Sequence, residues 1–320
     1  MKKASNKKRI VAIILLVVLA ICSVTLGIQY GKLSYMTSLG SAEKILDEPP
    51  ARGKVNILLL GVDEEGVRAD TIMVVSVDNV NKSIKLLSIP RDTRVTLNTG
   101  KKIKINACLG YESRETMMIG AIRAITGMPI HHYCEIDFDG FIEIIDILDG
   151  VDYDVPYDMD YDDDVQDLHI HLKAGPQHLD GQASHDFVRF RHNNRGSDVY
   201  APGEYALGDI GRISAQQNFI KELFRQKMQP QYLLKVTELL DAGYKYVKTD
   251  FSIATALKLI SIIKSAETTD METFTLPGEG QYINNVSYYL YFPDETRELV
   301  RTEFGYEDGK IIDTTTEVEQ

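Results

Sequence analysis

Two arginines stand two residues apart in a segment that is otherwise hydrophobic. Arg189 and Arg191 alternate with apolar residues in the run 187–191. On an extended strand, residues i and i+2 point to the same face, so the two guanidinium groups would lie side by side. They would repel each other unless an anion lay between them, and guanidinium groups bind phosphate oxygens with a bidentate fork. The segment predicts a phosphate-binding strand, with an ion pair to nearby Asp residues as the alternative.

A third arginine, Arg212, stands at the start of a predicted amphipathic helix whose apolar residues recur over 213–227. Gln216 follows one turn later on the same side. The start of a helix is electropositive, so an arginine there is mildly unfavourable and indicates a bound anion. Asp209, three residues earlier, is predicted to cap this helix.

Two polar loops follow predicted strands, and loops at strand ends commonly carry functional residues. The first loop contains Asp63, Arg68 and Asp70, and Arg91 begins the second. In each loop the alternative is an ordinary polar turn or a solvated strand end.

Lys104 and Asn106 are two residues apart and share one face if their segment is extended. The cationic side chains of all these segments could hold a pyrophosphate. The carboxylates could hold Mg²⁺ against it.

The elements that must position these residues follow from the hydrophobic pattern. Residues 55–60, 72–77 and 84–89 are apolar runs typical of buried strands, and the polar turn 78–83 joins the last two as a hairpin. Residues 117–125, 141–148 and 213–227 show helical spacing, and 168–172 alternates as a half-buried strand. We expect an α/β fold with a mixed central sheet flanked by helices, forming one domain over residues 53–305.

His169 and His171 fall on the exposed positions of the alternating strand, and no Cys or Glu stands at ligand spacing, which disfavours a zinc site. The acidic run 158–167 is interpreted as a solvated loop, with or without a bound cation. A glycosidase could use paired Asp residues from this run, but that reading leaves the arginines unexplained.

The N-terminus predicts a membrane anchor. A basic segment at 1–9 precedes 19 mostly apolar residues at 10–28, enough to cross a bilayer with the N-terminus in the cytoplasm. A cleaved signal peptide or a lipoprotein at Cys22 is the alternative, although no clear cleavage site follows and Ile21 is large for a lipoprotein signal. Residues 29–52 are predicted to be a linker, and 306–320 a flexible acidic tail.

Charge and cysteine content narrow the functional classes. The chain carries a net charge of −12, and all 47 acidic residues follow residue 28, which argues against a nucleic-acid partner. Three cysteines do not form a disulfide framework. Cys108 and Cys134 could pair outside the cell, but two buried thiols are favoured.

In these motifs the chain resembles the LytR-CpsA-Psr family of bacterial cell-wall ligases over about residues 53–305. The resemblance rests on seven segments in order: 68–71, 88–93, 104–107, 137–141, 175–181, 188–191, and 208–212 with Gln216-Gln217. The chain departs from the family at Ala69, where Ser is usual. It departs again at Ser184-His185-Asp186, where a small apolar and an aromatic residue are more common.

The resemblance implies a membrane-anchored, outward-facing enzyme that transfers teichoic acid, capsular or similar polymers from undecaprenyl pyrophosphate to peptidoglycan, with Mg²⁺ or Mn²⁺. It implies that Asp63 and Asp70 bind the metal, and that Asp209 and Asn106 play supporting roles. It implies that the pyrophosphate contacts Arg68, Arg91, Lys104, Arg189, Arg191, Arg212 and Gln216.

The expected reaction is direct phosphoryl transfer in which a peptidoglycan hydroxyl attacks the phosphorus bearing the sugar and undecaprenyl phosphate leaves. Asp70 is a candidate general base, although a metal ligand is a poor one. A carrier-binding module without catalysis and a lipid pyrophosphatase are the rival functions, and both would use the same arginines.

Overall fold

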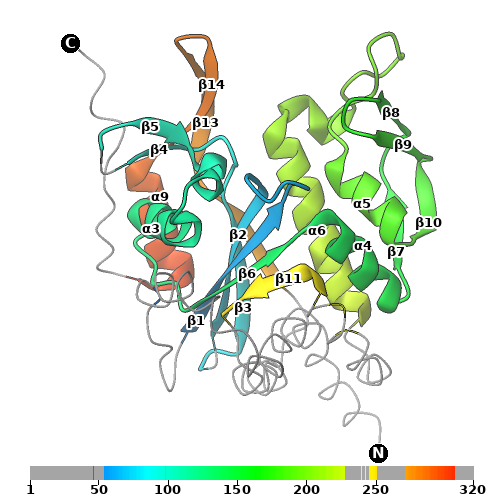
Figure 1. Ribbon diagram of the computed structural model, residues 1–320. Coiled ribbons are helices and arrows are strands. Elements are labelled where there is room, and N and C mark those ends of the chain that lie inside the picture. The colour runs from blue at the N-terminus through cyan, green and yellow to red at the C-terminus, as the bar shows by residue number, and fades with distance from the viewer. Residues whose placement is uncertain are drawn as a thin grey trace, which may run out of the picture. The chain divides into compact units, whose positions relative to one another are not determined.

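The computed structural model describes residues 46, 54–78, 80–97, 99–227, 239, 242, 245–250 and 271–306 (Figure 1). The predicted anchor at 10–28 and almost all of the predicted linker and tail lie outside these residues. In the part of the chain that is described, no helix is long and apolar enough to cross a membrane.

The described residues fall into two compact units. The sheet unit contains residues 54–137, 247–250 and 271–306, and the helix unit contains the described residues of 138–246.

The sheet unit is built on six strands in the order β11-β6-β1-β2-β3-β12. Strands β1 and β6 are parallel, as are β3 and β12, and the other neighbours are antiparallel, so the predicted mixed sheet is confirmed. The strands are β1 Lys54–Val62, β2 Ala69–Asp78, β3 Ser83–Ser88, β6 His132–Ile136, β11 Val247–Thr249 and β12 Met271–Thr275.

The apolar runs form the centre of this sheet because both of their faces are covered. Nearly every residue of β2 from Ile72 to Asp78 is buried, as expected for a central strand. The predicted β2–β3 hairpin is confirmed, and Asp78 holds its turn by accepting hydrogen bonds from the backbone N–H of Val80 and Asn81 at 2.8 and 3.0 Å.

Helices and short hairpins complete the sheet unit. The helix predicted over 117–125 is confirmed as α3 Arg114–Thr126, and Gly127 ends it in the left-handed conformation at φ 67°. The other elements are the hairpins β4 Arg94–Thr96 with β5 Lys102–Lys104 and β13 Gly278–Ile283 with β14 Val286–Tyr291, the 3₁₀ helix η3 Ile105–Gly110, α9 Pro293–Leu299 and the π-helix η6 Val300–Phe304.

The helix unit packs three helices against two small antiparallel sheets, in which β10 pairs with β7 and β8 pairs with β9 (Figure 1). Its core is rich in aromatic side chains, including Tyr153, Phe187, Phe190, Tyr205 and Phe219. Its elements are α4 Phe138–Ile147, β7 Val151–Val155, β8 Met159–Asp163, β9 Leu168–Leu172, β10 Gly175–Leu179, α5 Gly181–Arg189, the 3₁₀ helix η4 Gly203–Leu207 and α6 Asp209–Lys227.

Candidate functional site

In the sheet unit, the loop between β1 and β2 is closed by Asp63. One oxygen of its carboxylate, Oδ1, accepts hydrogen bonds from the backbone N–H of Val67 at 2.9 Å and of Arg68 at 3.1 Å. The backbone N–H of Asp63 donates to the carbonyl of Arg68 at 3.0 Å. These bonds fold the loop into a compact turn and leave the Arg68 side chain exposed at its end.

An ion pair connects this loop to the segment after β3. The register between β1 and β2 shifts at Gly61/Val62, and Asp70 occupies the irregular position on β2. The Asp70 carboxylate binds the guanidinium group of Arg91, which lies 21 residues away in sequence. Both side chains are between one-fifth and one-third exposed. The structure therefore brings together Asp70 and Arg91, two residues that sequence analysis placed in separate loops.

Lys104 and Asn106 belong to the same neighbourhood, but their segment is not extended throughout, so the condition for them to share one strand face is not met. Lys104 is the last residue of β5, and Asn106 lies in the 3₁₀ helix η3 that begins at Ile105. The ammonium group of Lys104 pairs with Asp92 at 3.0 Å, and the backbone N–H of Asn106 donates to the carbonyl of Arg91 at 3.1 Å. The backbone of Asn106 thus supports the backbone of Arg91.

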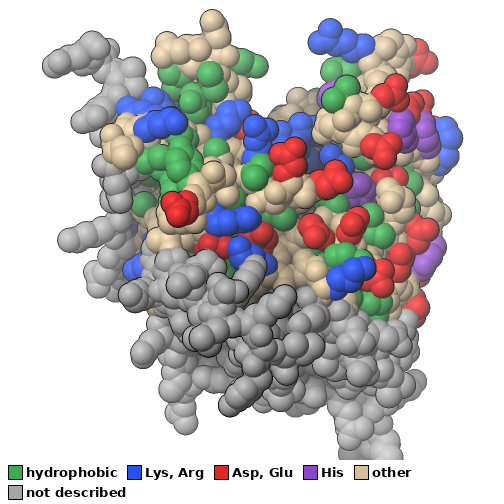
Figure 2. All heavy atoms as spheres, in the orientation of Figure 1, with side chains coloured by type: hydrophobic (Ala, Val, Ile, Leu, Met, Phe, Trp, Pro, Cys, Tyr) green, Lys and Arg blue, Asp and Glu red, His purple; other side chains and the backbone are tan. Residues whose placement is uncertain are grey.

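We call Asp63, Arg68, Asp70, Arg91 and Lys104 the strand-end group. Lysine and arginine side chains gather over β4 and β5 on the surface of this unit (Figure 2). The carboxylates of Asp63 and Asp70 have the donor type that Mg²⁺ or Mn²⁺ prefers. The hydrogen bonds of Asp63 and the ion pair of Asp70 described above each use a single oxygen, Oδ1.

In the helix unit, the predicted strand carrying Arg189 and Arg191 is a helix, so that prediction is wrong. Asp180 caps α5 by accepting a hydrogen bond from the backbone N–H of Ala183 at 2.8 Å. Arg189 is the last residue of α5, and Arg191 follows after the chain leaves the helix at Phe190, with φ −56° and ψ 140°. The two arginines therefore do not share a strand face. The aromatic residues of this run are instead those with which α5 packs into the core.

Arg189 is held on one side by an aromatic ring. Its guanidinium carbon lies 4.4 Å from the centroid of the Phe138 ring, and one of its nitrogens donates to Oε1 of Gln166 at 3.3 Å. Arg191 is exposed.

Arg212 lies in the first turn of α6, but the helix begins earlier than predicted. Asp209 is itself the first residue of α6, and the carbonyl of Gly208 accepts from the backbone N–H of Arg212 at 3.3 Å. The residue predicted to cap the helix, Asp209, thus lies within its first turn, and its carboxylate pairs with the Arg212 guanidinium group. Arg212 is 4% exposed.

Gln216 connects the two helices, because its side-chain amide donates to the carbonyl of Val188 in the last turn of α5 at 3.0 Å. This bond holds α6 next to the end of α5, where Arg189 and Arg191 lie. We call Arg189, Arg191, Asp209, Arg212 and Gln216 the helix group.

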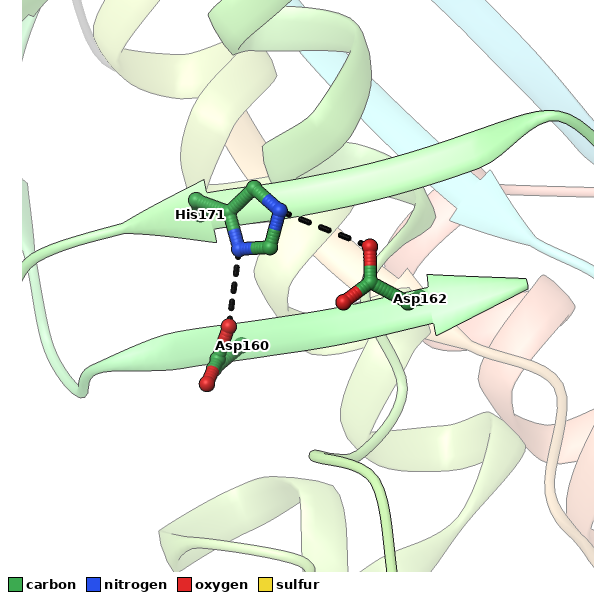
Figure 3. A group of neighbouring side chains, drawn as sticks. All are labelled: Asp160, Asp162 and His171. Atoms are coloured by element: carbon green, nitrogen blue, oxygen red, sulfur yellow. Dashed lines mark hydrogen bonds and ion pairs between the residues drawn. The ribbon is translucent and has the colours of Figure 1, made fainter. Parts of the chain in front are cut away.

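The predicted acidic loop is also different in the structure. Residues 159–163 form strand β8, and its Asp160 and Asp162 face His171 on the neighbouring β9 (Figure 3). Nδ1 of His171 lies 2.7 Å from Asp160 and Nε2 lies 3.4 Å from Asp162. The strand pairing thus supplies carboxylates that spacing along the sequence did not reveal.

His169 makes a similar contact, with Nδ1 2.7 Å from Asp162, and this carboxylate raises the pKa of His169 above its ordinary value, against partial desolvation. Figure 2 shows histidine and acidic side chains side by side on the surface of the helix unit. Asp160, Asp162 and His171 could together offer three ligand atoms within 4.8 Å of one another. In the structure, each imidazole nitrogen of His171 is engaged by a carboxylate.

One polar pair in α5 was noticed in the sequence only as a departure from the family pattern. His185 and Asp186 are 7% and 8% exposed, and Nδ1 of His185 lies 3.1 Å from Oδ1 of Asp186. The only signal for this pair in the sequence is the neighbouring His and Asp themselves, at 185 and 186.

Cys108 and Cys134 are both buried free thiols, which confirms the favoured prediction. Burial raises the pKa of the Cys108 thiol to about 12, so it is not a nucleophile at neutral pH.

Comparisons with known proteins agree with the resemblance seen in the sequence. The model of the LytR_cpsA_psr family matches residues 31–303. The chain is 29% identical over 271 residues to TagV of Bacillus subtilis, named a polyisoprenyl-teichoic acid–peptidoglycan teichoic acid transferase. That match covers 82% of this chain and 66% of TagV.

TagU of Halalkalibacterium halodurans, which carries the same functional name, is 30% identical over 259 residues, covering 79% of this chain and 78% of TagU. The crystal structure of Bacillus subtilis TagV matches with a TM-score of 0.63 at 28% identity, covering 79% of this chain and 97% of the TagV structure.

Proposed function

Because the chain belongs to the LytR_cpsA_psr family, we propose that it is a membrane-anchored phosphotransferase that acts outside the cytoplasm. In this proposal it transfers teichoic acid, or a capsular or similar glycopolymer, from undecaprenyl pyrophosphate to peptidoglycan and releases undecaprenyl phosphate. The names of its relatives TagV and TagU support teichoic acid as the polymer.

The observation that carries the proposal is the concentration of arginines in an acidic chain. With a net charge of −12, the protein gains nothing in solubility from clustering guanidinium groups. The structure places Arg68 and Arg91 near the ends of adjacent strands and links the helices of Arg189 and Arg212 through Gln216. Within each unit, guanidinium groups placed in this way are suited to bind phosphate oxygens.

In the proposed reaction the protein contributes mainly charge neutralisation and positioning, as in other phosphoryl transfers. The arginines, Lys104 and Gln216 would hold the pyrophosphate oxygens. An acceptor hydroxyl forms a new bond to the phosphorus that bears the sugar. The bond from that phosphorus to the bridging oxygen breaks, and the bridging oxygen leaves with undecaprenyl phosphate.

Asp63 and Asp70 would hold Mg²⁺ or Mn²⁺, which when bound supplies additional positive charge against the phosphate oxygens. Asp70 also pairs with Arg91. This pairing fixes the arginine before the substrate arrives. Asp209 does the same for Arg212, and Asn106 supports the backbone of Arg91.

The membrane part of the proposal rests on the sequence. The basic residues at 1–9 before the apolar run 10–28 favour a cytoplasmic N-terminus and an outward-facing catalytic part. To test this orientation, the exposed residue Val165 is replaced by cysteine. Intact cells are then treated with a thiol reagent that cannot cross the membrane, and labelling of the cysteine is measured. Labelling of Val165→Cys only after lysis would contradict the outward orientation.

The activity is tested with the purified full-length chain in detergent, Mg²⁺, carrier pyrophosphate bearing a fluorescent polymer, and peptidoglycan. We expect fluorescence to become covalently attached to peptidoglycan, and to be lost in Arg191→Ala and Asp70→Ala. Arg195→Ala, an exposed arginine outside both groups, is the matched control and is expected to transfer normally.

The outcomes separate the rival functions. Tight carrier binding with neither transfer nor cleavage would indicate a binding module, and release of free phosphorylated polymer would indicate a pyrophosphatase. Normal carrier binding and transfer by Arg191→Ala would remove that residue from the site while leaving the proposed activity intact.

A further inference from the structure

The His185–Asp186 pair in α5 has the geometry of an oriented imidazole. Oδ1 of Asp186 lies 3.1 Å from Nδ1 of His185, and the same oxygen accepts a hydrogen bond from the side-chain amide of Gln182 at 2.8 Å. The Gln182 amide nitrogen also lies near Nδ1, at 3.4 Å, which is farther than the Asp186 carboxylate oxygen. The shorter contact to the carboxylate favours the tautomer with the proton on Nδ1, which makes Nε2 the nitrogen that can accept a proton. Both residues are more than nine-tenths buried, so their rotamers are restricted by packing.

The pair lies next to a residue of the helix group. His185 precedes Arg189 by four residues on the same helix, and side chains at this spacing are neighbours on one helix face. Both contact the same ring: the imidazole of His185 meets Phe138 edge-on with centroids 5.1 Å apart, and the guanidinium group of Arg189 stacks over Phe138 at 4.4 Å. An anion bound by Arg189 would therefore lie close to the imidazole.

We propose that His185 is the general base of the transfer reaction and that Asp186 and Gln182 position it. This inference rests on the proposed function. It assigns the proton-accepting role to a residue that phosphate binding does not use.

The acceptor hydroxyl oxygen forms its bond to the phosphorus bearing the sugar, and its proton passes to Nε2 of His185. The bond between that phosphorus and the bridging oxygen breaks, and its electron pair leaves with undecaprenyl phosphate. The imidazolium ion then returns its proton to water or to the departing phosphate.

The other candidate base, Asp70, is poorly placed for this role, because its carboxylate is already paired with the Arg91 guanidinium group. Nδ1 of His185 instead faces the Asp186 carboxylate, which would stabilise the imidazolium ion formed in the reaction.

Several titratable groups on the elements packed against α5 bear on the pH dependence of His185. On α5 itself they are Asp186 and Arg189. On the packed elements they are Asp139, Glu143 and Asp146 of α4, Asp209, Arg212, Lys221, Glu222, Arg225 and Lys227 of α6, His169 and His171 of β9, and His178 of β10.

The test compares His185→Gln with His178→Gln in the full-length chain, using the polymer transfer assay across a range of pH. His178 also pairs with an aspartate, Asp152, at 2.8 Å, but it is exposed on β10. We expect His185→Gln to lower the maximal transfer rate by about 100-fold or more while carrier binding is retained, since general base catalysis typically contributes that much. His178→Gln should transfer at the wild-type rate.

The pH profile separates a base from a structural residue. The wild-type rate should fall on acidification as the imidazole becomes protonated, and the residual rate of His185→Gln should lack this decline. His185→Ala should regain activity when imidazole is added. If His185→Gln does not fold, Asp186→Asn carries the test. That variant should lose less of the transfer rate than His185→Gln. Its rate should also fall on acidification at a different pH from the wild-type rate.

Wild-type transfer by His185→Gln, or an unchanged acidic decline, would overturn this inference and leave the proposed function standing. If the wild-type chain attaches no polymer to peptidoglycan under any condition, the proposed function fails, and this inference fails with it.

Discussion

The strand-end group and the helix group hold their arginines in different ways. In the strand-end group, Arg91 and its partner Asp70 are both partly exposed, and neighbouring strands fix the backbone around them. In the helix group, Arg212 is 4% exposed and pairs with Asp209 in the same helical turn.

Burial decides what each pair contributes. A partly exposed arginine can exchange its carboxylate partner for a ligand at little cost, because water screens both charges. A buried arginine depends on its partner, because an uncompensated charge in the interior is expensive. The strand-end group should therefore affect activity more than stability, whereas the helix group should affect both.

The largest expected effect is on activity, from Arg91→Ala. Losing a donor positioned against transition-state charge typically costs about 100- to 1000-fold in rate, while the melting temperature should change little. The polymer transfer assay and a thermal melt check this, with Arg94→Ala on the adjacent strand β4 as the control. A melting temperature that drops as severely as the activity would abolish the contrast between the groups.

A large loss of stability is expected from Asp209→Ala, which leaves Arg212 buried without this carboxylate. Because Asp209 is itself partly exposed, we expect a loss of roughly 2–4 kcal/mol in the free energy of unfolding, at or below the range for breaking a buried pair.

The matched control is Asp294→Ala. Asp294 pairs with Arg297 at the same i, i+3 spacing, but its side chain is 95% exposed, so the expected loss is below about 1 kcal/mol. Urea unfolding of the two variants measures the difference. Equal losses would show that burial does not distinguish the pairs.

A smaller loss is expected from Gly66→Ala in the loop that carries Asp63 and Arg68. Gly66 has φ 66°, a conformation that costs a residue with a side chain about 1 kcal/mol. An added Cβ would meet only the Arg114 guanidinium nitrogens, at 4.0 Å, so no steric term is added. Urea unfolding should show this loss in the free energy of unfolding. A loss several times larger would mean that the loop is packed more tightly than the structure shows.

The smallest expected effect is a pH dependence of opposite sign at two buried carboxyl groups of the sheet unit. Burial raises the pKa of Glu135 above its ordinary value, against the opposing charges of Arg114 and Lys248. Burial also tends to raise the pKa of Asp78. Hydrogen bonds from Asn81 and Val80 outweigh this effect, so the pKa of Asp78 is lowered.

A raised folded-state pKa stabilises the protein at low pH, and this contribution is lost as pH rises from about 4.5 through the folded value. The wild type should therefore lose stability relative to Glu135→Gln as pH rises above about 4.5. Relative to Asp78→Asn, it should lose stability as pH falls below 3.8. Urea unfolding at several pH values measures both slopes, and slopes of the same sign would contradict the assignment.

The sequence predicted β1, β2 and β3, three of the six strands of the central sheet, because their signals are local. The apolar runs of β1, β2 and β3 are bounded by polar turns, and Gly127 marks the end of α3. The residues of these elements favour the observed secondary structure by themselves, and packing in the core stabilises the same structure.

The prediction failed at α5 because aromatic and β-branched residues there imitate a strand. The cap at Asp180 favours a helix, and the position of Phe187 in the aromatic core completes it. A pattern over five residues cannot report this tertiary packing.

The site residues were found through their types and the family resemblance, but their partners were not. The pair Asp70–Arg91 forms only when β2 and β3 align, and Asp160 faces His171 only through the pairing of β8 with β9. Both contacts depend on strand register, which spacing along the sequence does not specify.

The most direct test of the central claim follows one phosphorus atom. The carrier is prepared with ³²P in the phosphate attached to the sugar, and the wild-type chain is incubated with it, Mg²⁺ and peptidoglycan. The proposed phosphotransferase should leave the label covalently bound to peptidoglycan, with one unlabelled undecaprenyl phosphate released for each attachment. Label that remains with the lipid, or that appears only in soluble polymer, would contradict it.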